Sequence, residues 1–150
     1  MPADPRPVGV KEAHDALQNE AGAVYLDVRT EEEFAQGHPD GALNVPVGHP
    51  NPATRVLEAN PRFLDVARAV LPREVPVIIG CRTGPRAETA AQILAADGYR
   101  DVRWVYGGYV GMTDPFGNKL APGWLESGLP VSRDQGEGFG YESLRKKAGL

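Results

Sequence analysis

The sequence has a single cysteine, Cys81, among its 150 residues. One cysteine excludes an internal disulfide and any metal site built from several thiolates. No apolar run approaches the ~18 residues that a membrane-spanning helix needs, and the start of the chain has no apolar signal-peptide core. We therefore expect a cytoplasmic chain with no membrane association. Its thiol is either a small buried hydrophobic group or a reactive centre.

An excess of positive charge is also lacking. The 16 Lys and Arg residues are outnumbered by 20 Asp and Glu residues, so the net charge is −4. This balance argues against a nucleic-acid partner, although small anions could bind locally. The 41% hydrophobic and 24% charged contents are those of an ordinary folded protein. We expect one domain over residues 1–132 and a C-terminal appendage over 133–150, with a glycine-rich linker and a possible short basic helix from Tyr141 to Ala148.

Apolar strand candidates alternate with amphipathic helix candidates along the chain. Strands are predicted at 24–28, 42–45, 75–79 and 102–106, and helices at 11–19, 30–37, 60–72 and 85–98. This alternation predicts an α/β domain with a mainly parallel sheet and helices on both faces. Residues 107–130 are rich in Gly and Pro, which predicts a long surface excursion. We expect Trp104 to be a core residue and leave Tyr109 and Trp124 open between the core and a contact with a ligand.

Cys81 directly follows the strongest strand signal and precedes a helix that opens at Gly84-Pro85. This places the thiol at the carboxyl end of a parallel strand, where open α/β sheets bind their ligands. A helix N-terminus offers unpaired N–H groups and partial positive charge, and Arg82 and Arg86 lie in the same loop. Such surroundings favour a thiolate, so we expect Cys81 to be a nucleophile near neutral pH.

The remaining loop residues are suited to a tight turn that cradles an anion. Gly84 permits unusual backbone angles, and Thr83 is expected to form a local hydrogen bond. Pro85 has no N–H, so the cradle should have one donor fewer, although the fixed φ of proline suits the first helical turn. His38 and His49 have no third ligand at a recognisable spacing, so we expect no metal and no other cofactor. His14 is expected to be a surface residue.

Three segments together resemble the rhodanese-like sulfurtransferase family. The first runs from Cys81 to Arg86, and the second is Tyr25-Leu26-Asp27-Val28-Arg29 with Glu33-Phe34, Gly37-His38 and the segment 41–46. The third is Val105-Tyr106-Gly107-Gly108, followed by the segment 128–131. The chain differs from the family pattern at Pro39-Asp40, at Pro85 and in a segment over 112–123 that is inserted relative to the shortest members. This inserted segment is expected near the site entrance.

The resemblance implies a three-layer α/β/α fold around a five-stranded, mainly parallel sheet. It also implies that Cys81 carries sulfur as a persulfide, and that the donor is thiosulfate or another persulfide. The acceptor would be a thiol, cyanide or a protein. The loop residues Arg82, Thr83, Gly84, Arg86 and Ala87 would bind the small anionic donor, the two arginines by guiding it. Asp27 and Arg29 are interpreted as a buried hydrogen-bonded framework, because buried carboxylates are usually paired.

Two other functions are consistent with the same residues. A non-enzymatic module could carry sulfur within a complex or sense redox state through Cys81. A hydrolase similar to the related phosphatases is disfavoured, because that class has five residues between cysteine and arginine. Only four lie between Cys81 and Arg86. The shorter loop is better suited to sulfur than to a phosphoryl group.

Overall fold

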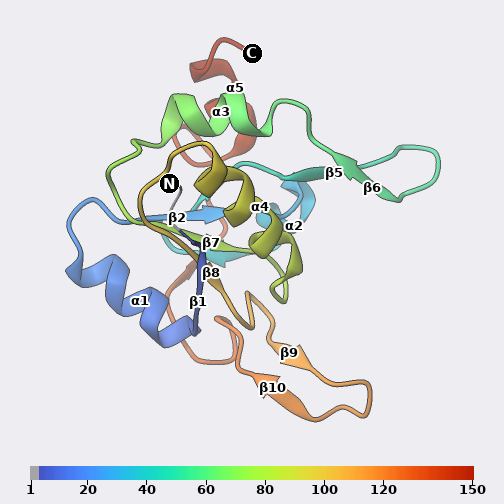
Figure 1. Cartoon of the computed structure of the whole chain (residues 1–150). Helices are drawn as coiled ribbons and strands as arrows, with labels where there is room; N and C mark the ends of the chain where they lie inside the picture. The colour runs from blue at the N-terminus through green and yellow to red at the C-terminus, as the bar shows by residue number, and fades with distance from the viewer. Residues whose placement is uncertain (1–3) are drawn as a thin grey trace.

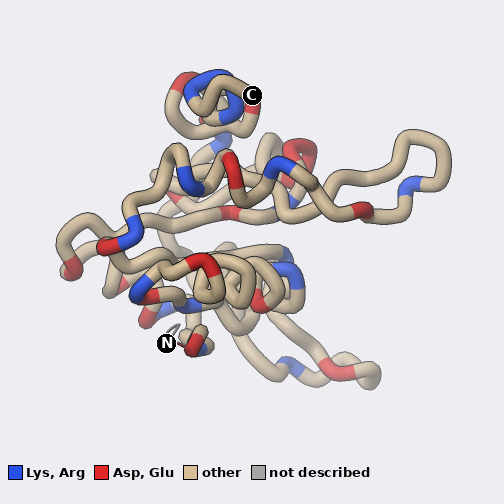
Figure 2. Tube along the Cα trace, turned by 45° about the horizontal axis from the view of Figure 1, so that its top comes forward, with Lys and Arg blue, Asp and Glu red and all other residues tan. Residues whose placement is uncertain are grey.

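The computed structural model describes residues 4–150, and Pro2 of the proline-rich start lies outside the described residues. Figure 1 shows a layered body from which two hairpins project. Across residues 4–150, no helix combines the length and the apolar character needed to cross a bilayer. Basic and acidic residues are interspersed along the chain (Figure 2).

Five parallel strands form the central sheet, in the order β1-β8-β7-β2-β4. They are β1 (Arg6–Val8), β2 (Val24–Asp27), β4 (Leu43–Asn44), β7 (Val77–Gly80) and β8 (Val102–Val105). The expected α/β fold with a five-stranded parallel sheet is confirmed. Strand β1 was not predicted, because Pro5 and Pro7 made its segment resemble irregular chain. A proline is tolerated there because β1 is an edge strand, which pairs only with β8.

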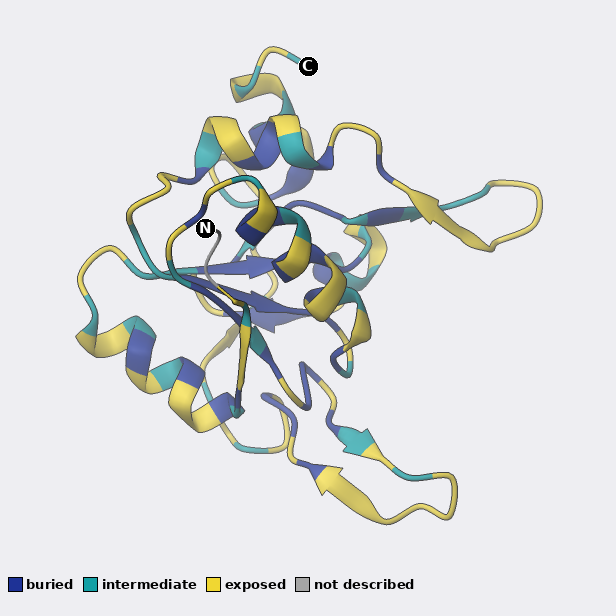
Figure 3. Ribbon diagram, in the orientation of Figure 1, coloured by how far each residue is buried: buried dark blue, intermediate teal, exposed yellow. Residues whose placement is uncertain are grey.

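Within residues 4–150, five helices cover the two faces of the sheet. They are α1 (Val10–Asn19), α2 (Glu31–Gln36), α3 (Phe63–Val70), α4 (Pro85–Ala96) and α5 (Tyr141–Lys147). Helices α3, α4 and α5 bury their apolar residues in one core, and α1 and α2 in the other. Alternation along β7 separates the cores, since Val77 and Ile79 belong to the first and Ile78 to the second. Figure 3 shows the buried strands between the helical layers.

Local side-chain hydrogen bonds shape the chain at the starts of α2 and α3. Helix α2 begins with a capping box, in which the Thr30 hydroxyl accepts from the Glu33 amide and the Glu33 carboxylate accepts from the Thr30 amide. Helix α3 runs from Phe63 to Val70, within the range of 60–72 that the sequence predicts. The Asn60 side chain accepts from the Arg62 amide at 3.0 Å and holds a turn before the helix.

Around the sheet, the described part of the chain forms three short antiparallel strand pairs. Strand β3 (His38–Pro39) pairs with β11 (Val131–Ser132), β5 (Gly48–Pro50) with β6 (Leu57–Ala59), and β9 (Met112–Thr113) with β10 (Lys119–Ala121). The β9–β10 hairpin occupies most of the inserted segment and projects from the body (Figure 1). The segment beyond it returns to pair with β3. The predicted surface excursion is therefore partly ordered by strand pairing.

The expected C-terminal appendage is wrong in its packing, although its short helix exists as α5. Tyr141 and Leu144 of α5 are buried in the same core as α3 and α4. The Asn60 amide group donates to the Tyr141 hydroxyl at 3.1 Å, and the Asn44 backbone N–H donates to the Phe139 carbonyl at 2.9 Å. The glycine-rich segment before α5 thus leads the chain back onto the sheet edge instead of acting as a loose linker.

Candidate functional site

Cys81 lies between the end of β7 and the start of α4, at the carboxyl edge of the parallel sheet. Only 2% of the residue is exposed. The Gly84 backbone N–H donates a hydrogen bond to the Cys81 Sγ at 3.1 Å. The loop therefore folds back so that one of its own amides faces the sulfur, which is the arrangement that stabilises negative charge on it.

The backbone of this loop is held by the segment that follows β8. The carbonyl groups of Cys81, Arg82 and Thr83 accept from the amides of Tyr109, Val110 and Gly107, at 2.9, 3.0 and 2.9 Å. These bonds require a close approach at Gly108, which has a φ of +56°. A Cβ atom there would lie 2.6 Å from the Cys81 and Arg82 carbonyl oxygens. The paired glycines therefore allow one loop to pack on the other.

Helix α4 opens directly behind the cysteine loop. Pro85 is its first residue, as predicted, and Gly84 precedes it with a φ of +156°. The amides of Arg86 and Ala87 find no acceptor within residues 4–150, as is usual in the first turn of a helix. Ala87 itself is buried in the core. Thr83 is half-buried, and within that range its hydroxyl forms no hydrogen bond.

Arg86 is held by Glu33 of helix α2. Its Nη1 and Nη2 atoms donate to the two carboxylate oxygens of Glu33 at 2.6 and 3.0 Å. Partial burial tends to raise the pKa of Glu33, but the hydrogen bonds from Arg86 outweigh it and lower the pKa to about 2. Arg86 was expected to guide an anionic donor. In the structure its guanidinium instead forms a bidentate ion pair that ties the cysteine loop to α2.

Arg82 differs from Arg86 in both exposure and pairing. Its side chain is exposed, and it forms no ion pair within the described part of the chain. It lines an open pocket beside the cysteine loop. Of the two arginines in the loop, Arg82 is therefore the one placed to meet an anion from solvent.

Asp27 and Arg29 form a buried pair at the end of β2. The Arg29 Nη2 donates to Asp27 Oδ2 at 2.7 Å and to the Gly37 carbonyl at 2.7 Å, and Nε donates to Asp27 Oδ1 at 3.0 Å. The Arg29 guanidinium also lies 4.5 Å from the centre of the Tyr109 ring. The Asn44 side chain donates to the carbonyl groups of Asp27 and Arg29. The pairing inferred from the sequence is therefore present and joins several elements beside the site.

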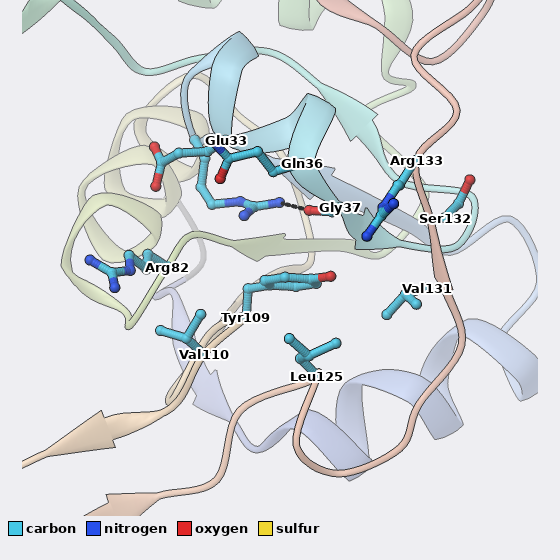
Figure 4. Close-up of a pocket in the computed structure, with 11 residues that line it drawn as sticks. Glu33, Gln36, Gly37, Arg82, Tyr109, Val110, Leu125, Val131, Ser132 and Arg133 are labelled. Carbon is cyan, nitrogen blue, oxygen red and sulfur yellow. Dashed lines mark hydrogen bonds between the residues drawn. The ribbon is translucent and has the colours of Figure 1, made fainter.

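The open pocket has a volume of about 510 Å³. It is lined by Arg29, Glu33, Gln36, Gly37, Arg82, Tyr109, Val110, Leu125, Val131, Ser132 and Arg133. Figure 4 shows Arg82 and Arg133 at its two ends, with Tyr109 between them. Sequence reasoning missed Glu33, Gln36 and Arg133 as site residues. Glu33 was placed only in the predicted helix at 30–37 and in the segment that resembles the family, and Arg133 in the appendage over 133–150.

The other candidate side chains have structural positions. His38 is buried, and its ring stacks on the ring of Phe34. The His38 Nδ1 atom forms a hydrogen bond with the Phe34 carbonyl oxygen at 2.8 Å. Trp124 is 1% exposed and donates to the Pro130 carbonyl. Trp104 packs against the core and is only partly buried. His14 is half-buried against Trp124 instead of being free on the surface. Residues 4–150 contain no group of three or more His, Cys, Asp and Glu side chains that could hold a metal ion.

Comparison with known proteins agrees with this geometry. Residues 10–114 match the family model described as the rhodanese-like domain. The chain is 37% identical over 127 residues to thiosulfate sulfurtransferase 16, chloroplastic, of Arabidopsis thaliana, which covers 85% of this chain and 92% of that protein. Thiosulfate sulfurtransferase 18 of the same plant is 33% identical over 132 residues, which cover 87% of this chain and 85% of that protein.

A solved structure extends the match to three dimensions. The crystal structure of Rv0390 from M. tuberculosis superposes with a TM-score of 0.72 and 29% identity, and covers 88% of this chain and all of that one. The match of the family model to well over half of the chain, and relatives above 30% identity along most of its length, identify the domain. The chain belongs to the rhodanese-like family.

Proposed function

We propose that this protein is a sulfurtransferase that carries a sulfane sulfur on Cys81 as a persulfide. The observation that carries the proposal is the Cys81 sulfur at the opening of α4, with the Gly84 amide bonded to it. Relatives named thiosulfate sulfurtransferases support the class of reaction. The donor would be a small anion, either thiosulfate or a persulfide, and the acceptor a thiol, cyanide or a thiol on a protein.

The proposed reaction has two displacement steps. In the first, the Cys81 thiolate attacks the outer sulfur of thiosulfate, the bond between the two donor sulfurs breaks, and sulfite leaves with the electron pair. In the second, the acceptor attacks the outer sulfur of the Cys81 persulfide, and the Cys81 thiolate leaves. The Gly84 amide and the open amides of Arg86 and Ala87 are suited to stabilise negative charge on the sulfur, and exposed Arg82 to attract the donor.

Mass spectrometry of the intact protein tests this function directly. Treatment with thiosulfate should add the mass of one sulfur atom, and subsequent cyanide should remove it with formation of thiocyanate. Cys81→Ser should show neither change while unfolding at the same urea concentration as the wild type. The proposal is wrong if no sulfane donor changes the mass, or if Cys81→Ser is loaded equally.

The low exposure of Cys81 favours a second candidate, a sulfur carrier or redox sensor that does not turn over by itself. Such a module would be loaded once by a donor but would show no catalytic transfer to cyanide or small thiols. Turnover of thiosulfate and cyanide beyond one equivalent of protein separates the two functions. A phosphate ester should not be turned over, because Arg86 is already paired with Glu33.

A further inference from the structure

The open pocket beside the cysteine loop is built from two parts of the chain. Arg29, Glu33 and Tyr109 lie within residues 10–114, which match the family model, whereas Leu125 and Arg133 lie beyond that match. The later segment is fixed in place, because β11 pairs with β3 and the Leu125 amide donates to the Tyr109 carbonyl at 3.0 Å. One wall of the pocket is therefore supplied by chain outside the matched region.

The charges that line the pocket do not cancel. Arg29 is neutralised by Asp27, and Glu33 by Arg86. Arg82 and Arg133 form no ion pair with any described residue, and Figure 4 places them at opposite ends of the pocket. The pocket thus has two uncompensated positive charges, separated along its length, which favour a ligand with negative groups at both ends.

Arg29 contributes a largely buried guanidinium to the lining of this pocket. Arg29 is 4% exposed, and its Nε and Nη2 atoms are bonded to Asp27 and Gly37. Its Nη1 atom makes no hydrogen bond within residues 4–150, yet no fully buried side-chain nitrogen or oxygen there lacks a partner. Nη1 is therefore not fully buried, and Arg29 is one of the residues that line the pocket. The Asp27 pair and the Tyr109 ring hold it in place.

The remaining walls match an organic ligand more than a simple inorganic anion. Figure 4 shows Gln36 on one side of Tyr109, and the apolar side chains of Val110, Leu125 and Val131 on the other. A volume of about 510 Å³ lies in the range of sites for small organic molecules, about 300–1,000 Å³. Thiosulfate has no organic part to contact these walls. It would use only the end at Arg82, the residue that follows Cys81 in the chain.

We propose that this pocket binds the organic part of a carboxylate-bearing persulfide, with its sulfur at the Cys81 end and a carboxylate at Arg133. This inference rests on the proposed sulfurtransferase function and names the substrate class for it. The Cys81 thiolate attacks the outer sulfur of the donor R–S–SH, and the S–S bond breaks. The thiolate R–S⁻ leaves with the electron pair, while the outer sulfur and its proton remain on Cys81. Arg133 is then a specificity-determining residue that contacts the donor far from the reacting sulfur.

Kinetics of Cys81 loading with two donors test the assignment. For glutathione persulfide, Arg133→Gln should raise the half-saturating concentration about three- to ten-fold, because a charge-assisted contact is lost. For thiosulfate, the same variant should stay within about two-fold of the wild type. Arg100→Gln is a matched control, since Arg100 is exposed and lies outside the pocket. Equal effects of Arg133→Gln on both donors, or none on either, would overturn the proposal.

Direct binding separates this inference from the proposed function. Calorimetry with Cys81→Ser and S-methylglutathione should show binding that Arg133→Gln weakens and Arg100→Gln leaves unchanged. If thiosulfate loads Cys81 but S-methylglutathione does not bind, the sulfurtransferase function stands and the assigned substrate class is wrong. If S-methylglutathione binds but no donor loads Cys81, the pocket stands and the sulfurtransferase function fails.

Discussion

Glu33 has two structural tasks at once. Its carboxylate caps helix α2 through the Thr30 amide, and it also binds both terminal nitrogens of Arg86 in the cysteine loop. The cap was readable from sequence, because Thr30 and Glu33 have the spacing of a capping box. The ion pair was not, because 53 residues separate Glu33 from Arg86 and no local pattern relates them. Arg86 therefore positions the loop by way of α2.

Glu33→Gln isolates the ionic part of this interaction, since glutamine can still cap the helix. The pKa of Glu33 is lowered to about 2 from an ordinary 4.5, so the carboxylate stabilises the fold above about pH 4.5. That stability is lost as the pH falls from 4.5 toward 2. Because the pair is partly exposed and screened by solvent, we expect Glu33→Gln to lower the free energy of unfolding at pH 7 by roughly 1 kcal/mol.

Urea unfolding of the wild type and the variant at several pH values measures this effect. The difference between them should be constant from about pH 7 to 5 and should shrink below about pH 4.5. Glu32→Gln is the control, because the Glu32 side chain is exposed and pairs only with exposed Arg55. A difference that is the same at pH 7 and pH 3 would show that the charge of Glu33 is not the cause.

Gly108 is the residue at which two loops touch. Gly108→Ala would place a Cβ atom 2.6 Å from two backbone oxygens of the cysteine loop. Gly128→Ala is the control. It also places alanine at a positive φ, +72°, but its added Cβ atom would meet open space. We expect Gly108→Ala to lose about 1–3 kcal/mol more stability than Gly128→Ala. It should also lose sulfur loading of Cys81. Equal urea midpoints for the two variants would contradict this view of the contact.

Single residues of the cysteine loop were largely predictable, whereas their side-chain partners were not. The order of strand, Cys81, Gly84 and helix follows from sequence patterns of neighbouring residues, and the structure retains that order. The pocket that extends from Arg82 depends on Tyr109 and Arg133, which tertiary packing brings to it from distant segments. Arg133 has no local signal, because an exposed arginine after a turn looks the same in a tail and in a pocket wall.

At the scale of elements, α5 shows how far a short helix can contribute to a core. It has only seven residues, too few to be stable alone, so its packing on α3 and β4 must stabilise it. Glycines at 136, 138 and 140 made the preceding segment resemble a linker. In the structure, the chain there turns and runs beside Asn44. A high glycine content alone does not distinguish a flexible linker from an ordered turn that packs against the sheet.

Leu144→Ala tests whether α5 belongs to the folding unit. Leu144 is 2% exposed and packs in the core with α3, so its truncation should cost about 2–4 kcal/mol in a single cooperative unfolding transition. Lys146→Ala, on the exposed side of the same helix, should change stability by no more than about 0.5 kcal/mol. If both variants unfold at the wild-type urea concentration, α5 is an appendage after all.

For the whole molecule, the charge on the protein and the charge in the pocket have opposite signs. The net charge of −4 repels an anion at long range, and the acidic and basic residues are interspersed along the chain (Figure 2). Arg82 and Arg133, which form no ion pair within residues 4–150, attract an anion at short range. Salt screens the long-range repulsion before the short-range attraction, because the Debye length is about 8 Å at 0.15 M and about 3 Å at 1 M.

This opposition predicts a particular dependence of kcat/KM on salt for an anionic persulfide. From about 0.01 to 0.15 M NaCl, the loss of long-range repulsion should offset the early weakening of attraction, so kcat/KM should change by less than about two-fold. Toward 1 M the contacts in the pocket are themselves screened, and kcat/KM should fall several-fold. The double variant Arg82→Gln, Arg133→Gln should have a lower kcat/KM than the wild type at low salt, and its kcat/KM should fall little further at 1 M NaCl. An equal fall in wild type and double variant would mean that salt acts elsewhere than on these two arginines.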